Sequence, residues 1–142
     1  MGRLVGAYEC TLDPKGRVVI PAPLRPALGP TVVLVLGMDP CVLAYPESRW
    51  GRVEEVVLEL PQFDEESAWI RRALGEAAEE RVVDGQGRIL IGESLRRDAG
   101  LSRHVLVVGV FDKLEIWDRE AYRATRSAKV TPEWRRRIGG RL

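Results

Sequence analysis

Short apolar stretches alternate with turn-forming residues along most of this 142-residue chain. The stretches are four to six residues long and rich in valine, isoleucine and leucine, which is typical of β-strands. In the first third of the chain they occupy residues 7–12, 17–20, 32–36 and 41–45. The pattern therefore predicts a mainly β protein built from hairpins.

The first predicted hairpin has a turn of defined chemistry. Asp13-Pro14-Lys15-Gly16 places Asp at the first, Pro at the second and Gly at the fourth position of a type I turn. Gly16 is free to adopt a positive φ, which the bulge of a three-residue hairpin loop requires. Farther along, the prolines of residues 21–28 favour a short helix, and Gly29 suits its C-cap. Residues 38–40 form a second predicted turn between the last two strands.

The same scheme occurs a second time in the chain. Residues 13–20 match residues 84–91 at an offset of 71, and after one inserted residue 33–37 match 105–109 at an offset of 72. Chance does not produce this register over about forty residues, so the chain contains an internal repeat. The second copy is expected to contain a turn at 84–87, a helix at 93–99, strands at 104–108 and 114–117, and a turn at 111–113 between them.

The two copies are expected to fold together. A unit of about forty residues is too small to hold a core without a disulfide, a metal or a partner. The other copy can be that partner if each copy's strands complete the other's sheet and leave few open edges. The repeat therefore predicts an α+β protein, mainly β with peripheral helices, in which two swapped-hairpin units form one pseudo-twofold β-barrel.

Amphipathic helices are expected outside the repeated units. Apolar residues recur at helical spacing in 46–60 and in 64–74, where Gly75 ends the pattern. A helix at 118–128 follows the second copy, and Thr131-Pro132 resembles the start of another. These helices are the expected surface for other subunits. The predicted organisation is a first unit at 7–49, a helical connector at 50–77, a second unit at 78–121 and a basic C-terminal helix and tail at 122–142.

Five of the nine aromatic residues fall into two groups. Tyr45 and Trp117 occupy matched strand positions and are expected in the core. Trp50, Trp69 and Trp134 lie on the predicted helices. For these three, an intersubunit contact and ordinary helix packing fit the sequence equally well.

Charge is distributed unevenly although the net charge is only +1. Residues 1–71 carry 7 Lys/Arg and 10 Asp/Glu, whereas residues 72–142 carry 15 and 11. From Arg119 onward eight basic residues face two acidic ones, which fits a solvated helix face as well as a nucleic-acid patch. The small net charge argues against a purely electrostatic DNA binder.

The composition excludes several other classes of protein. It lies in the globular range, at 45% hydrophobic and 30% charged residues, and no apolar run is long enough for a membrane span. The N-terminus has no apolar leader, so we expect a cytoplasmic protein with no membrane partner. With one histidine, His104, and two cysteines, Cys10 and Cys41, the chain lacks the ligands of a zinc site. We expect no enzyme activity, small-molecule substrate, metal or cofactor.

The doubled turn carries a family resemblance. Asp13-Pro14-Lys15-Gly16-Arg17, followed by Ile20-Pro21 and Leu24-Arg25, closely resembles the MraZ family, as do its copy at 84–88 with 95–101 and the run 107–118. The resemblance implies tandem SpoVT-AbrB-type swapped-hairpin units and ring-like oligomers. It also implies a transcriptional regulator, expected to be a repressor, that binds short direct repeats in the promoter of its own division and cell-wall gene cluster.

Double-stranded DNA and further copies of the chain are therefore the expected partners, and the DNA-binding role that the resemblance implies adds the expectation that the protein is nucleoid-associated. At a hairpin tip, Arg17 or Arg88 could enter a major groove and pair with guanine, with Asp13 or Asp84 orienting it. Lys15 suits a phosphate, and its counterpart Gln86 could read adenine or contact the backbone. Arg25 and Arg96 follow by the same logic, although a structural role against the Asp carboxylates fits equally well. DNA contact is expected more strongly from Lys15 and Arg17 than from Gln86 and Arg88, because Gln86 makes the second turn less basic.

Other interpretations of the turn motif stay open. Asp and Arg four residues apart also form a salt bridge that merely pins the arginine to its own loop. An antitoxin-like protein of the same fold class would join one DNA-binding unit to a disordered toxin-neutralising tail, but here a second full copy occupies that place. An architectural oligomer of this fold is a further alternative.

Overall fold

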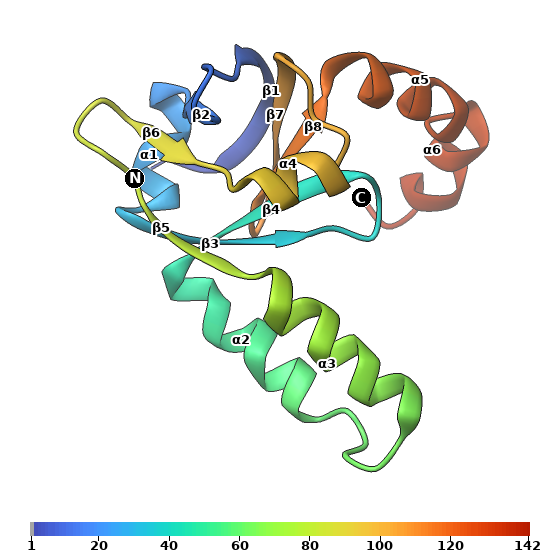
Figure 1. Ribbon diagram of the computed structural model, residues 1–142. Helices are drawn as coiled ribbons and strands as arrows, with labels where there is room; N and C mark the ends of the chain where they lie inside the picture. Colours follow the sequence, from blue (N-terminus) through green and yellow to red (C-terminus); the bar gives the residue numbers. More distant parts are fainter. Residues whose placement is uncertain (1) are drawn as a thin grey trace.

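The computed structural model describes residues 2–142 and confirms an α+β fold (Figure 1). The strands are β1 (Leu4–Thr11), β2 (Arg17–Val19), β3 (Thr31–Leu36), β4 (Cys41–Pro46), β5 (Glu79–Val82), β6 (Arg88–Leu90), β7 (His104–Phe111) and β8 (Leu114–Asp118). The helices are η1 (Ala22–Leu24), α1 (Arg25–Leu28), α2 (Glu47–Leu58), α3 (Glu65–Ala77), α4 (Glu93–Asp98), α5 (Arg119–Lys129) and α6 (Pro132–Gly139).

The strands form a six-stranded antiparallel sheet and a separate two-stranded ribbon. The order in the sheet is β1-β7-β8-β4-β3-β5, and the ribbon pairs β2 with β6. The order is the same when each strand is exchanged for its counterpart in the other copy, β1 for β5, β7 for β3 and β8 for β4. Leu43 pairs with its counterpart Glu115 at the centre of the sheet, and Val18 pairs with its counterpart Ile89 at the centre of the ribbon. The first strand of each copy pairs with the other copy, β1 with β7 and β5 with β3. This is the swapped-hairpin arrangement that the repeat predicts.

The predicted closure into one barrel is wrong. Within residues 2–142, β1 and β5 end an open sheet and do not pair with each other. The sheet stays open because the chain turns after each edge strand and continues into the ribbon, from β1 into β2 and from β5 into β6. Two hydrogen bonds then tie the ribbon across the copies, from Ile20 N–H to Gly87 O at 2.8 Å and from Ile91 N–H to Gly16 O at 2.9 Å.

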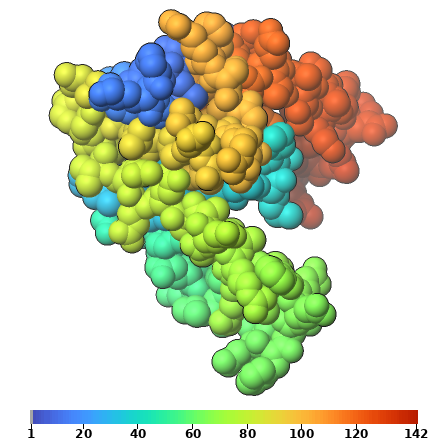
Figure 2. All heavy atoms as spheres, viewed as in Figure 1, coloured from blue at the N-terminus to red at the C-terminus, as the bar shows by residue number. Residues whose placement is uncertain are grey.

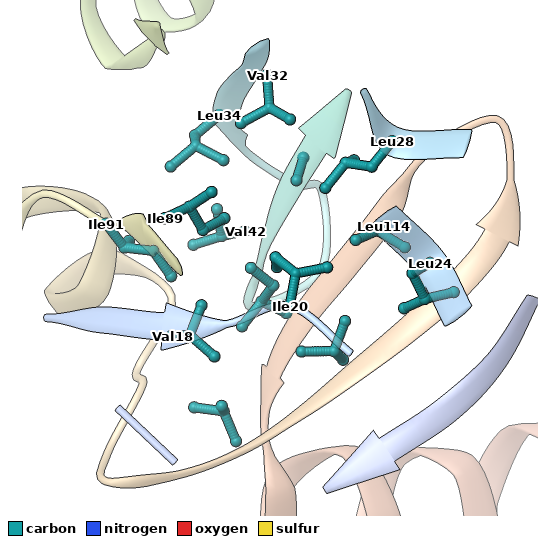
Figure 3. Close-up of a cluster of buried hydrophobic side chains, with 14 of the residues drawn as sticks. Val18, Ile20, Leu24, Leu28, Val32, Leu34, Val42, Ile89, Ile91 and Leu114 are labelled. Carbon is teal, nitrogen blue, oxygen red and sulfur yellow. The ribbon is translucent and has the colours of Figure 1, made fainter. Parts of the chain in front are cut away.

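The core fills the space between the ribbon and the sheet (Figure 3). Val18, Ile20 and Leu24 of the first copy are fully buried, as are Ile89, Ile91 and Leu95 of the second. They pack with sheet residues that include Val32, Leu34, Val42 and Leu114. Burying each such side chain contributes about 1.5–3 kcal/mol, and here the contribution depends on both copies.

The two cysteines are free thiols, and burial raises the pKa of Cys41 to about 12.

Two helical extensions project from this body (Figures 1 and 2). Helices α2 and α3 form a hairpin in which Arg71 donates to the carbonyls of Leu58 and Leu60. The predicted end of the second helix at Gly75 is wrong, because α3 continues through Ala77. Helices α5 and α6 lie at another side of the molecule. In residues 2–142, no helix combines the length and the apolar character needed to cross a membrane.

Candidate nucleic-acid interface

The first turn is organised around the carboxylate of Asp13. Its Oδ1 accepts the backbone N–H groups of Lys15 and Arg17, both at 2.9 Å, and its Oδ2 accepts Nε of Arg17 at 2.7 Å. The Asp13 backbone closes the loop by accepting from Gly16 and donating to Arg17, both at 2.9 Å. One carboxylate therefore fixes both the loop backbone and the direction of the Arg17 side chain.

The second turn repeats this geometry with Asp84. Its Oδ1 accepts the N–H groups of Gln86 and Arg88 at 2.9 and 2.8 Å, and its Oδ2 accepts Nε of Arg88 at 2.8 Å. In both turns the arginine uses only Nε, so its two Nη groups have no hydrogen-bond partner within residues 2–142. Each turn thus presents the outer end of a guanidinium, which can donate two parallel hydrogen bonds.

The electrostatics keep both carboxylates charged. The Arg17 backbone N–H, with the Arg17 side chain and the Lys15 N–H, holds the pKa of Asp13 below its ordinary value. The Arg88 backbone N–H, with the Arg88 side chain and the Gln86 N–H, does the same for Asp84. A lowered carboxyl pKa means that the stabilising contribution is present at neutral pH and is lost only as the pH falls through that lowered value.

Both arginines lie on one face of the ribbon. The pairing places Arg17 opposite Leu90 and Val19 opposite Arg88. Because side chains alternate along a strand, these four residues share the outer face, whereas Val18 and Ile89 point into the core. Diagonal neighbours across an antiparallel pair are about 7–8 Å apart. The ribbon therefore holds Arg17 and Arg88 near each other, one from each copy.

Arg25 and Arg96 lie beneath the turns. Each guanidinium packs against the glycine of the opposite copy's turn, Arg96 against Gly16 and Arg25 against Gly87. A Cβ at Gly16 would lie 2.6 Å from Cζ of Arg96, and a Cβ at Gly87 would collide with Arg25 in the same way. Arg25 also donates from Nε to the Ile20 carbonyl at 2.8 Å. In the structure, these two arginines pack against the opposite turn and form no ion pair or hydrogen bond with the Asp carboxylates.

Lys15 and Gln86 are exposed at the tips of their turns. Neither side chain is hydrogen-bonded to another residue within 2–142. The geometry of the two turns is therefore the same, and their tips differ in charge.

Glu79 is a residue at the ribbon that the sequence pattern did not identify. Its Oε1 accepts the backbone N–H of Gly92 at 2.9 Å, and a Cβ at position 92 would collide with this carboxylate. The matching residue in the first copy is Pro21, which has no N–H and needs no acceptor. Tyr8 accordingly stands where the second copy has Glu79. Both pairs are related by the offset of 71. The role of Glu79 could therefore have been found by noting that the second copy has Glu and Gly where the first copy has Tyr and Pro.

Comparison with known proteins assigns the chain to a family. The family described as "MraZ protein, putative antitoxin-like" matches residues 4–73 and again 74–130. The chain belongs to the MraZ family. Each MraZ segment contains one Asp-x-x-x-Arg turn, at Asp13 to Arg17 and at Asp84 to Arg88.

Similar MraZ proteins come from several bacteria. "Transcriptional regulator MraZ" of Lactobacillus delbrueckii subsp. bulgaricus is 37% identical over 118 residues, covering 83% of this chain and 82% of that protein. The protein of the same name from Heliobacterium modesticaldum is 39% identical over 118 residues, with coverage of 83% and 82%. That of Caldanaerobacter subterraneus subsp. tengcongensis is 40% identical over 119 residues, with coverage of 84% and 83%.

Proposed function

We propose that this protein is a sequence-specific DNA-binding transcriptional regulator that reads bases with the outer face of its ribbon. The observation that carries the proposal is the pair of turns in which an Asp carboxylate occupies Nε of an arginine and leaves both Nη groups available. A two-stranded ribbon fits the major groove, where an arginine pairs bidentately with O6 and N7 of guanine. Relatives named transcriptional regulators agree with this role.

The remaining turn residues receive different roles. Lys15 is exposed at the tip of its turn and suits a phosphate oxygen, which positions the protein without reading sequence. Gln86 reads adenine or contacts the backbone. Arg25 and Arg96 act indirectly, because they hold the opposite turns through Gly87 and Gly16.

Assembly into a ring-like homo-oligomer is part of the proposal. The helical hairpin at 47–77 carries eight acidic and four basic residues, and the tail at 119–142 carries eight basic and two acidic residues. Both project from the body and expose large apolar side chains, Phe63 (97%) and Trp69 (60%) on the hairpin and Trp134 (44%) on the tail. The hairpin of one subunit is thus complementary to the tail of the next. Such a head-to-tail contact generates a ring when the rotation closes.

The MraZ resemblance supplies the remaining features of the proposal. The regulator acts as a repressor at short direct repeats in the promoter of its own division and cell-wall gene cluster. Several linked subunits would bind repeated sites through effective concentration, which a net charge of +1 makes necessary for tight binding.

A mobility-shift experiment tests the DNA-binding role. The protein should shift DNA from upstream of its own gene and leave a scrambled duplex of equal composition unshifted. Equal binding of the two duplexes would favour an architectural oligomer.

A spacing experiment tests the ring. Inserting half a helical turn between two repeats should lower affinity far more than inserting a whole turn of about 10–10.5 bp, because only the whole turn returns the same groove face. A variant truncated before Trp134 should form smaller assemblies and lose this dependence. If the truncated variant forms smaller assemblies but binds as tightly as the full chain, with no spacing effect, the ring has no part in binding.

A further inference from the structure

Two apolar side chains are exposed next to the ribbon arginines. Val19 is 48% exposed and Leu90 is 39% exposed, whereas their neighbours Val18 and Ile89 are 0% and 1% exposed. In the register of the ribbon, Arg17 lies opposite Leu90 and Val19 lies opposite Arg88. The outer face is therefore a square with the two arginines on one diagonal and the two apolar residues on the other.

This arrangement is repeated by both copies of the unit. Val19 and Leu90 are related by the same offset of 71 as Arg17 and Arg88. Single exposed apolar residues are common on protein surfaces. Here, however, both copies place an apolar residue at the same outward position, and each lies directly across the ribbon from the other copy's arginine. The core gains little from these side chains, since the opposite face of the ribbon packs into it.

The arginines identify the partner that this face would meet. In the major groove, the base edges beside the guanine acceptors O6 and N7 offer one apolar group, the C5 methyl of thymine, which apolar side chains contact. Directly opposite residues on a ribbon have Cβ atoms about 4.5–5.5 Å apart, roughly one and a half times the rise of about 3.4 Å between successive bases on a strand. An apolar residue opposite an arginine thus reaches a neighbouring base pair.

We propose that Val19 and Leu90 contact thymine methyl groups at base pairs adjacent to those read by Arg17 and Arg88. The proposal rests on the proposed function, because it requires the outer face of the ribbon to enter the major groove. It makes the ribbon selective for A·T pairs next to G·C pairs, with a specificity that the arginines alone cannot supply.

Replacing thymine by deoxyuridine tests this contact, because the change removes only the methyl group. A duplex would be selected from a random-sequence library with the wild-type protein and then synthesised with thymine or with deoxyuridine. Wild-type affinity should fall about fourfold for each methyl contact that is lost, the factor expected for one buried CH₂-sized group. The double variant Val19→Ala with Leu90→Ala should bind the thymine duplex more weakly and should bind both duplexes equally.

Val5→Ala is the matched control. Val5 is a strand valine with a similar exposure of 40%, at the end of β1 remote from the turn. This variant should keep the full ratio of affinities for the thymine and deoxyuridine duplexes. Thermal midpoints measured for all variants would show whether each one folds.

The outcomes separate this inference from the function on which it rests. A selected duplex that the wild type binds equally with thymine and deoxyuridine would overturn the methyl contact and leave base reading by the arginines intact. Retention of the deoxyuridine effect in the double variant would also overturn it. If the double variant does not fold, the wild-type comparison still decides. Failure to enrich any duplex would instead overturn the DNA-reading role itself.

Discussion

The two copies of the repeat differ at their turns in an informative way. Asp, Gly and Arg are identical in both turns, and their hydrogen bonds agree to within about 0.1 Å. The tip differs, with Lys15 in one copy and Gln86 in the other. The start of the next helix also differs, with Pro21 in one copy and Gly92 bound by Glu79 in the other. Backbone geometry thus restricts the positions that close the turn to one residue type, whereas the exposed tip, where no backbone contact depends on the side chain, differs between the copies.

The largest expected effect comes from separating the copies. The fragment 1–49 should fail to fold as a monomer, because the core residues of the first copy pack against those of the second. Nuclear magnetic resonance with sedimentation checks this. A well-dispersed spectrum from a monomeric fragment would show that one copy is sufficient, whereas folding as a homodimer would agree with the swapped arrangement.

The glycines of the turns should come next. Gly16→Ala should lower the free energy of unfolding by roughly the 1–2 kcal/mol that a left-handed backbone costs, and Gly87→Ala should lower it further, because its Cβ also displaces Arg25 from the hydrogen bond to the Ile20 carbonyl. Gly100→Ala is the matched control, since its φ is +66° and no atom lies within 4 Å of its added Cβ. Equal losses at positions 87 and 100 in chemical denaturation would remove the supporting role of Arg25.

Loss of an arginine should affect binding and leave folding almost unchanged. Arg17→Ala should weaken specific DNA binding by about 1–3 kcal/mol, and Arg88→Ala should weaken it less, because its turn lacks a lysine. The thermal midpoint should stay nearly constant, since the Asp13–Arg17 pair is partly exposed. A folding defect would assign the arginine to structure, and equal losses of affinity would show that the turns are equivalent.

The smallest expected effect is an exchange of the tips. Lys15→Gln should reduce the slope of log affinity against log salt by about 0.9 per engaged subunit, the value for one phosphate contact. Gln86→Lys should increase the slope by a similar amount if the second turn lies equally close to the backbone. An unchanged slope in Lys15→Gln would remove Lys15 from the DNA contact.

Much of this architecture could be predicted from the sequence, because each turn is specified locally. The Asp-x-x-Gly-Arg pattern contains its own hydrogen-bonding partners, and the offset of 71 relates the two copies. Closure of the sheet could not be predicted, because it depends on which distant strands pair. Strand β5 gave no apolar signal, since three of its four residues are Glu79, Glu80 and Arg81. Gly75 continues a helix because one glycine costs only about 1 kcal/mol there.

The placement of Arg25 and Arg96 also depends on tertiary structure. Each arginine contacts a glycine that lies about sixty to eighty residues away in the chain and in the other copy. No local pattern distinguishes such a supporting arginine from one that contacts DNA.

The division of the chain into a first unit at 7–49, a connector at 50–77, a second unit at 78–121 and a tail at 122–142 stays a prediction.

The most direct measurement of the central claim is the ratio of affinities for a selected duplex and a scrambled duplex in a variant with Arg17→Lys and Arg88→Lys. Lysine keeps the positive charge but replaces the planar two-nitrogen fork, which matches O6 and N7 of guanine, by a single strongly hydrated ammonium that discriminates the bases less. We predict that the ratio falls toward one while affinity for the scrambled duplex is retained, and that the control Arg126→Lys on α5 keeps the wild-type ratio. An unchanged ratio in the double lysine variant would contradict base reading by the ribbon arginines.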